Sequence, residues 1–469
     1  MTGGPERTRH KYRRSLLWIW DEAGDFYPFR LRLSAVEIHF RRGMWSGAED
    51  LCRHGALACE RLGRIYEKGL FLNQLGNILS YRGMRHEALE SMHQAHQILS
   101  ERPESLIMIS VLYNLGYACE HFGDLDKSLE YYAAGQNLAR RLGDHRSENR
   151  ANGNIGIIYA MRGDFGTALD YFRRLLESSA KLEDLAGVAL AHGNLGLALL
   201  YSGKPEEAQT HLQQKLDLSR EMGDRLGICQ ALGSLGDLQA SRGDYPLALK
   251  SYQLAREHAV AMNNLNMIVT ADEKTGEIML LQGRYPEAAG VFIGAIDLVE
   301  KRGSRLSLPS LWQKAGDCYL ETGQLGLAEK SFNKSIAVGK EDSQEPFYMG
   351  AYRGLARLSN LRGQREQAME HCQKFLELAE KYNDRIYVFD GRVLECLIKK
   401  TTDPEAAIIG LSGLLARAGS DAERAEVLYC LWEIRGTARD RQEALEALNL
   451  AAGQTPSALH EARINKLQE

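Results

Sequence analysis

The sequence contains no apolar run of the roughly 18 to 20 residues that a membrane-spanning helix needs. The apolar stretch "SLLWIW" near the start is only six residues long and follows the basic segment "RTRHKYRR", so a signal-peptide core is not indicated. A surplus of one charge is also missing, because 58 basic and 62 acidic side chains give a net charge of -4. This balance provides no general attraction to nucleic acid or anionic lipid. We therefore expect a cytoplasmic protein that neither binds nucleic acid nor inserts into a membrane.

No C-x-x-C pair occurs among the eight cysteines, so neither a zinc ribbon nor a thioredoxin-like site is indicated. Reduced thiols packed in the interior are expected instead. The length of 469 residues fits two to four globular domains or one elongated array. A composition of 44% hydrophobic and 26% charged residues is typical of a folded chain.

Catalytic motifs are missing as well. "HEALE" has Glu90 where a zincin needs its second histidine, "GKP" lacks the rest of a phosphate-binding loop, and no G-x-S-x-G occurs. His86, Glu90, His93 and His96 could share a helix face and hold a metal, but such an outer face is commonly just solvated. We expect a non-enzymatic protein with no catalytic residue, no metal and no cofactor.

The sequence repeats with a period of 40 residues, and an internal repeat of this kind indicates which fold the chain adopts. The series of glycines at this spacing comprises Gly43, Gly83, Gly123, Gly163, Gly203, Gly243, Gly283, Gly323 and Gly363. A small residue stands five positions after each glycine, and a large or sulfur-containing residue stands nine positions after it. A second glycine series precedes the first by seven positions and includes Gly76, Gly116, Gly156, Gly196, Gly236, Gly276 and Gly316.

Each period predicts a helix, a tight turn and a second helix. Gly163 falls where a helix end needs a left-handed residue, and prolines in "GKP", "GDYP" and "GRYP" fall in the first turn of the following helix. Gly156 and Ala168 are small enough to let the two helices approach closely, and we expect Phe172 to fill the gap between units. A nucleotide loop is not favoured for "GNIG", because no strand precedes it.

This pattern resembles the tetratricopeptide repeat (TPR) in its 40-residue form, through "NLG" or "NIG" before the turn, the G-x(4)-A-x(3)-F/Y step, and "LGD", "MGD" or "YND" between units. It is similar to the arrays of Pins-type adaptors, to kinesin light chains and to bacterial TPR regulators. The resemblance implies an all-α fold, a right-handed superhelical solenoid of helix-turn-helix repeats.

Three segments are predicted. Residues 1–28 are expected to form a basic and aromatic extension or capping helix, in which Trp18 and Trp20 pack on the first repeat. Residues 29–388 are expected to form nine 40-residue units. The period slips in residues 389–469, which are expected to form degenerate helical hairpins that cap the array.

Ligand-binding residues are expected on the first helix of each unit, because first helices line the concave surface of such a stack. Amides predominate in the early units and charged side chains in the later ones. The candidate ligand- or partner-binding residues are Asn73, Asn77, Asn114, Arg150, Asn154, Asn194, Asp237, Lys274, Glu277, Lys314, Asp317, Arg353 and Arg357.

An asparagine ladder can hydrogen-bond an extended peptide backbone, but the same amides can also tie one repeat to the next. Both readings stay open at the level of sequence. Asn73, Asn77, Asn114 and Arg150 resemble half of the carboxylate clamp of chaperone-binding TPR proteins, although the first lysine is missing and Asn154 stands where a cation is expected.

Two functions follow. The first is a protein-interaction scaffold that binds a peptide segment or a partner domain in the groove. The second is a ligand- or peptide-sensing regulatory module of a larger signalling ATPase, kinase or transcription regulator.

Overall fold

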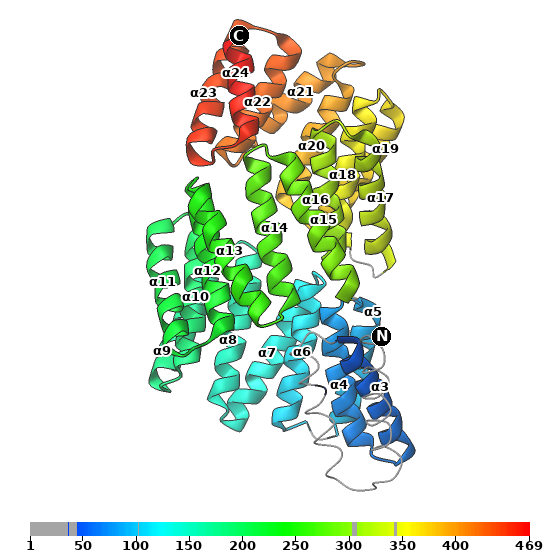
Figure 1. The fold of residues 1–469 in the computed structure, drawn as a ribbon, viewed down its shortest axis with the longest axis vertical. Coiled ribbons are helices and arrows are strands. Elements are labelled where there is room, and N and C mark those ends of the chain that lie inside the picture. The colour runs from blue at the N-terminus through cyan, green and yellow to red at the C-terminus, as the bar shows by residue number, and fades with distance from the viewer. Residues whose placement is uncertain (1–35, 37–44, 102, 303–306, 342–344) are drawn as a thin grey trace, which may run out of the picture. The chain divides into compact units, whose positions relative to one another are not determined.

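The computed structural model describes residues 36, 45–101, 103–302, 307–341 and 345–469. The described part contains 22 helices and no strand, so the predicted all-α fold is confirmed (Figure 1). Among these helices, none is both long enough and apolar enough to cross a bilayer. Gly43, Trp18, Trp20 and the predicted segment 1–28 lie outside the described residues.

The chain divides into two compact units, residues 1–151 and 152–469, with the boundary inside one helix. The first unit contains α3 (Trp45–Arg61), α4 (Ile65–Tyr81), α5 (Arg85–Leu99), α6 (Leu106–His121), α7 (Leu125–Leu142) and the start of α8 (His145–Met161). The limits 29–388 and 389–469 that the sequence suggests for the array and its cap stay a prediction.

The second unit holds the rest of α8 and sixteen further helices. Those that follow the 40-residue period are α9 (Phe165–Lys181), α10 (Leu185–Tyr201), α11 (Pro205–Glu221), α12 (Arg225–Ser241), α13 (Tyr245–Ala261), α14 (Leu265–Leu281), α15 (Tyr285–Arg302), α16 (Leu308–Glu321), α17 (Leu325–Glu341), α18 (Glu345–Leu361) and α19 (Arg365–Lys381). The remaining helices are α20 (Arg385–Lys399), α21 (Pro404–Leu415), α22 (Asp421–Arg435), α23 (Ala438–Gln454) and α24 (Ala458–Gln468).

Left-handed glycines make the turn inside each helix pair. Every described member of the 40-residue glycine series has φ between 70 and 81°, as predicted. At Gly163 the backbone N–H bonds to Ala160 O, and the N–H of Asp164 bonds to Tyr159 O, both at 2.9 Å. These bonds satisfy carbonyls that the end of α8 leaves free.

A second left-handed turn joins consecutive pairs, and it is less dependent on glycine. Gly143 and Gly223 occupy it with φ of 70 and 65°, whereas Glu183, Asn263 and Asn383 adopt φ of 52 to 53° without being glycine. After either kind of turn, the next residue is commonly an aspartate whose side chain accepts a hydrogen bond from the first turn of the following helix. Such caps are formed by Asp124, Asp164, Asp184, Asp224, Asp244 and Asp384.

Close contact between the two helices of a pair explains the second glycine series. A Cβ added at Gly156 would lie 2.5 Å from Cε1 of Phe172, which is buried. The same arrangement repeats at Gly316, where an added Cβ would lie 2.6 Å from Phe332. Phe332 also reaches the next unit, because a Cβ at Gly354 would lie 2.3 Å from its ring. The aromatic residue therefore packs within its own pair as well as filling the gap between units.

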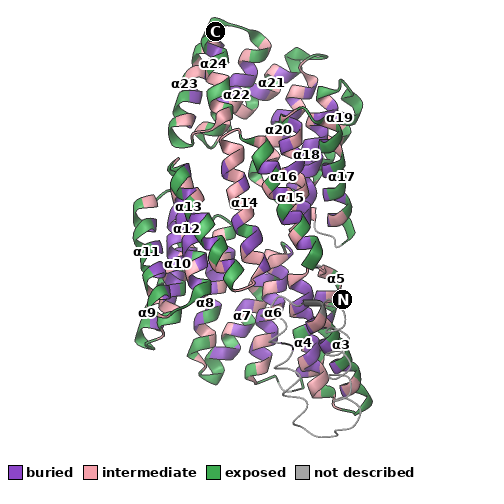
Figure 2. Ribbon diagram, in the orientation of Figure 1, coloured by how far each residue is buried: buried purple, intermediate pink, exposed green. Residues whose placement is uncertain are grey.

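Burial differs between the two helices of a pair. First helices such as α10 and α12 expose few side chains, whereas α9 and α11 show a continuous exposed face (Figure 2). Most helices pack against the next one in the chain, as α12 does against α13, and first helices such as α10 and α12 also contact each other. All eight cysteines are buried and unbridged, as expected of packed thiols.

Candidate ligand-binding face of the first helices

The thirteen predicted site residues all lie on first helices: α4, α6, α8, α10, α12, α14, α16 and α18. We call their side chains the first-helix face. Because the two units are described separately, the part on residues 1–151 and the part on residues 152–469 are treated in turn.

In the first unit, an amide pair connects neighbouring repeats. Asn114 Nδ2 of α6 donates a hydrogen bond of 3.1 Å to Oδ1 of Asn73 in α4, and Asn73 is only 5% exposed. The guanidinium of Arg150 lies 4.6 Å from the centroid of the Tyr113 ring. Asn77 forms no side-chain hydrogen bond within the described residues. In this unit Asn73 and Asn114 therefore pair with each other, and Asn77 is left with unused hydrogen-bonding groups.

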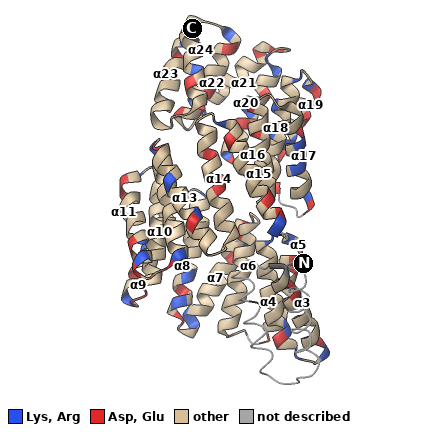
Figure 3. Ribbon diagram, viewed as in Figure 1, with Lys and Arg blue, Asp and Glu red and all other residues tan. Residues whose placement is uncertain are grey.

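In the second unit, the two ladder amides are free. Neither Asn154 on α8 nor Asn194 on α10 has a hydrogen-bond partner among the described residues, and Nδ2 of Asn194 is shielded from solvent. A donor that is shielded and unpaired costs about 1–3 kcal/mol, and an incoming group can pair with this Nδ2 only after the side chain of Asn194 rotates. Helix α10 carries no charged residue, so its ribbon is tan in Figure 3. Hydrogen bonding, not charge, thus characterises the side chains here.

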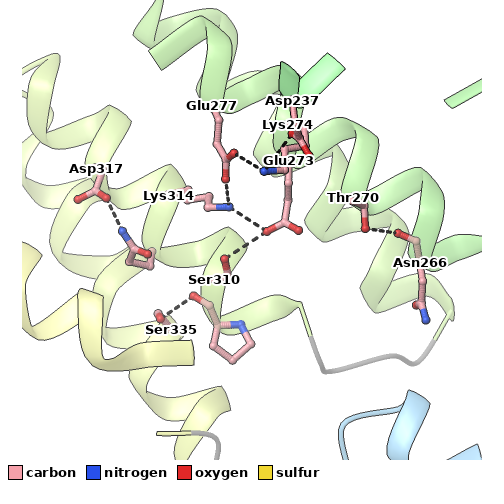
Figure 4. Close-up of polar contacts among 12 residues, drawn as sticks. Asp237, Asn266, Thr270, Glu273, Lys274, Glu277, Ser310, Lys314, Asp317 and Ser335 are labelled. Carbon is pink, nitrogen blue, oxygen red and sulfur yellow. Dashed lines mark hydrogen bonds and ion pairs between the residues drawn. The ribbon is translucent and has the colours of Figure 1, made fainter. Parts of the chain in front are cut away.

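From α12 onward the first-helix face becomes an ion-pair network (Figure 4). Lys314 Nζ of α16 lies 2.7 Å from Glu277 Oε1 and 3.2 Å from Glu273 Oε1, both on α14. Lys274 Nζ lies 3.5 Å from Glu277 Oε2 and 3.4 Å from Asp237 Oδ1 on α12. The carboxylate of Asp237 also accepts a hydrogen bond of 2.8 Å from the Tyr252 hydroxyl.

A second group of ion pairs links α16, α18 and α20. Arg353 lies 3.7 Å from Asp317 and 3.1 Å from Asp390, and Arg357 lies 2.6 Å from Glu321. Asp317 also accepts a hydrogen bond from Gln313, while its Oδ1 and the Nε of Arg353 lack partners among the described residues. Each predicted charged residue from Asp237 to Arg357 thus has an oppositely charged partner on a neighbouring helix, whereas Arg150 of α8 contacts the Tyr113 ring instead.

Burial and ion pairing shift the pKa values of these carboxyl groups in opposite directions. Burial disfavours the charge of Glu277, but Lys314 and Lys274 overcome it and hold the pKa of Glu277 below its usual range. For Asp317, burial outweighs the nearby Arg353 and raises the pKa of the carboxyl. Such pairs connect first helices of successive repeats, so this part of the face has the arrangement of an inter-repeat tie.

Three contributors were not among the predicted site residues. Glu273 lies on α14, one residue before the predicted Lys274, and Asp390 lies beyond the point where the 40-residue period slips. Lys215 stands on the second helix α11, at a position where Ala95, Ala255 and Ala295 stand in other units. Its departure from that pattern was the signal that could have identified it.

No group of three or more His, Cys, Asp and Glu side chains within the described residues is arranged to hold a metal ion.

Comparison of the sequence with known protein families and with curated proteins identifies the repeat type. Models of the tetratricopeptide repeat match residues 107–181, 187–259 and 309–338. Response regulator aspartate phosphatase A of Bacillus subtilis is 24% identical over 160 residues, which are 34% of this chain and 40% of that protein. The match therefore spans less than half of that relative.

Two solved structures are similar at low identity. A Rap protein complexed with competence and sporulation factor is 15% identical, with 76% of this chain and 99% of that chain covered and a TM-score of 0.48. A signal-transduction ATPase with a tetratricopeptide repeat sensor from Pyrococcus horikoshii is 14% identical, with 84% and 64% covered and a TM-score of 0.48. The repeat matches and the helix pairs that continue at the same spacing lead to one conclusion: this chain is a tetratricopeptide repeat protein with an all-α solenoid fold.

Proposed function

We propose that this chain is a non-enzymatic protein-interaction scaffold, and that it binds a peptide segment along α8, α10 and α12. The observation that carries the proposal is the contrast between two parts of the first-helix face. The charged residues from Asp237 to Arg357 are engaged with one another, whereas Asn154 and Asn194 have no partner within the described residues.

A peptide backbone is the ligand that such amides suit best. An asparagine side chain offers two N–H donors and a carbonyl acceptor, and an extended peptide presents both kinds of group at each residue. Helix-pair solenoids bind partners along their extended inner surfaces. Asn154 and Asn194 are 40 residues apart and stand at equivalent positions of successive repeats, so they offer the same groups at a regular spacing.

A regulatory role is the second candidate. The partial similarity to a response regulator aspartate phosphatase supports a module that acts on a signalling protein. In that case peptide binding would be the input of the module, and the two candidates would share the same site.

The proposal is tested with a double variant, Asn154→Ala and Asn194→Ala, against Asn114→Ala as a matched control. The probe is an equimolar library of synthetic free pentapeptides, with retention on immobilised protein measured by mass spectrometry. Each lost hydrogen bond is worth about 0.5–1.5 kcal/mol, so the double variant should retain peptides about 5- to 150-fold less strongly. Asn114→Ala should instead lower the unfolding free energy, because it leaves buried Asn73 unpaired. Equal retention by wild type and a folded double variant would refute the proposal.

A further inference from the structure

Lys215 is the one lysine or arginine among the described residues whose side chain is buried. It lies on α11 and is 6% exposed. The equivalent positions of other units, at the same 40-residue spacing, hold uncharged residues: Ala95, Gly135, Leu175, Ala255, Ala295, Ser335 and Phe375. The fold therefore does not require a lysine at this position.

The side chain of Lys215 extends from α11 to the first helices on either side. A Cβ added at Gly193 of α10 would lie 2.5 Å from Cδ and 2.8 Å from Nζ of Lys215. The missing side chain at Gly193 thus makes the space through which the lysine passes. At its end, Nζ donates a hydrogen bond of 3.2 Å to Oε1 of Gln230 on α12, and Gln230 is exposed. The amine therefore lies between α10 and α12, beside a residue that solvent reaches.

The charge of this lysine is not balanced. Lys274, Lys314 and Arg353 each have a carboxylate within 4.0 Å, but Lys215 forms no ion pair with any residue that the structure describes. Burial lowers the pKa of Lys215 to about 8, and Asp224 and Cys229 act in the opposite direction. A buried cation with only a neutral amide as partner is unfavourable. A ligand that brings a negative charge would remove this penalty.

The chemistry of that ligand group follows from the number of donors. One ammonium suits a single carboxylate, through a charge-assisted hydrogen bond of the strong kind. Nucleic acid is disfavoured, because its binding depends on several cations that neutralise successive phosphates. The neighbouring residue Asn194 on α10 has no hydrogen-bond partner among the described residues, and its shielded Nδ2 becomes available to a ligand when the side chain rotates. A peptide that lies across α8, α10 and α12 would therefore meet amide donors and then a cation.

We propose that Lys215 binds a carboxylate of the peptide ligand between α10 and α12, with Gln230 giving up its hydrogen bond to the incoming group. This inference rests on the proposed peptide-binding function and adds to it a chemical preference. The carboxylate is either the C-terminus of the peptide or the side chain of an aspartate or glutamate.

The test compares Lys215→Met with Lys250→Met. Methionine keeps the length of the lysine side chain without its charge, and Lys250 on α13 is an exposed lysine that serves as the matched control. Two pentapeptide libraries are offered to each protein, one with free C-terminal carboxylates and one with C-terminal amides. Thermal unfolding of each variant is followed in parallel, and Lys215→Met should melt no lower than wild type because an unpaired buried charge is removed.

Wild type and Lys250→Met should enrich carboxylate-bearing peptides about 10- to 100-fold over their neutral counterparts, and Lys215→Met should lose that preference. Enrichment that disappears in the amide library assigns the C-terminus, and enrichment of Asp- or Glu-containing peptides in both libraries assigns a side chain. If peptides bind but Lys215→Met retains the same preference, the carboxylate site is refuted while peptide binding stands. If wild type enriches no peptide from either library, both proposals fail.

Discussion

Replacing Gly156 by alanine tests whether the second glycine series exists for helix packing. The added Cβ would lie 2.5, 2.9 and 3.0 Å from Cε1, Cδ1 and Cζ of Phe172, whose ring is 2% exposed. Overpacking of this kind costs about 1–3 kcal/mol. Alanine also favours a helix over glycine by about 1 kcal/mol. The expected net result is a destabilisation of about 0–2 kcal/mol.

A matched substitution removes the helix-propensity contribution. Gly294 lies in the interior of α15, is exposed, and would place an added Cβ in open space. Gly294→Ala should therefore stabilise its helix by about 1 kcal/mol. The difference between the two substitutions, about 1–3 kcal/mol, measures the contact with Phe172 alone.

Because repeat arrays can unfold in parts, the assay is native-state hydrogen exchange of amides in α8, α9 and α15, not one global melting temperature. Faster exchange in α8 and α9 for Gly156→Ala, with slower exchange in α15 for Gly294→Ala, is the expected pattern. Equal stabilisation by both substitutions would show that Phe172 moves aside freely, and the packing argument would be wrong.

Four further predictions concern turns and charges. Gly163→Val should lower the unfolding free energy by about 1–2 kcal/mol, because a β-branched residue is disfavoured at its φ of 78°. Glu183→Gly should raise the unfolding free energy by about 0.5–1 kcal/mol, since glycine removes the strain of a φ of 53°. Urea unfolding measures both, and an unchanged midpoint in either would contradict the turn geometry. Lys314→Met should destabilise the contact between α14 and α16 by about 1–3 kcal/mol, because Glu273 and Glu277 lose their shared cation; unchanged hydrogen exchange in both helices would refute a tying role. In the folded state, burial lowers the pKa of Lys215 from 10.5 to about 8, so between pH 8 and 10.5 the unfolded chain binds more protons than the folded one. The unfolding free energy of wild type should therefore increase relative to that of Lys215→Met as the pH rises from 8 to 10.5. Parallel curves of stability against pH for the two proteins would contradict the burial of the charge.

The sequence predicted the helix pairs well, because each turn depends on local chemistry. A left-handed glycine such as Gly163 and a proline at the start of the next helix, such as Pro205, depend on the backbone and not on distant contacts. The role of Phe172 was only partly foreseen, since its contact with Gly156 depends on how the two helices of one pair are rotated.

The candidate site was harder to predict. Position on a first helix could be read from the period, but whether a side chain there is free or engaged depends on its neighbours one repeat away. Lys314 has two glutamates within reach and Asn194 has none of its donors used, a difference that no spacing reveals. Lys215 was missed because it stands on a second helix and reaches the face only through the space left by Gly193.

Photo-crosslinking tests the central claim, that a peptide binds along α8, α10 and α12, most directly. The probe is the pentapeptide most enriched by wild type from the libraries, resynthesised with one photoreactive leucine, and the crosslinked residues are identified by mass spectrometry. We predict crosslinks on the first helices near Asn154, Asn194 and Gln230, and their loss in the Asn154→Ala and Asn194→Ala double variant. Crosslinks concentrated on the exposed faces of α9, α11 and α13, unchanged in the double variant, would contradict the claim.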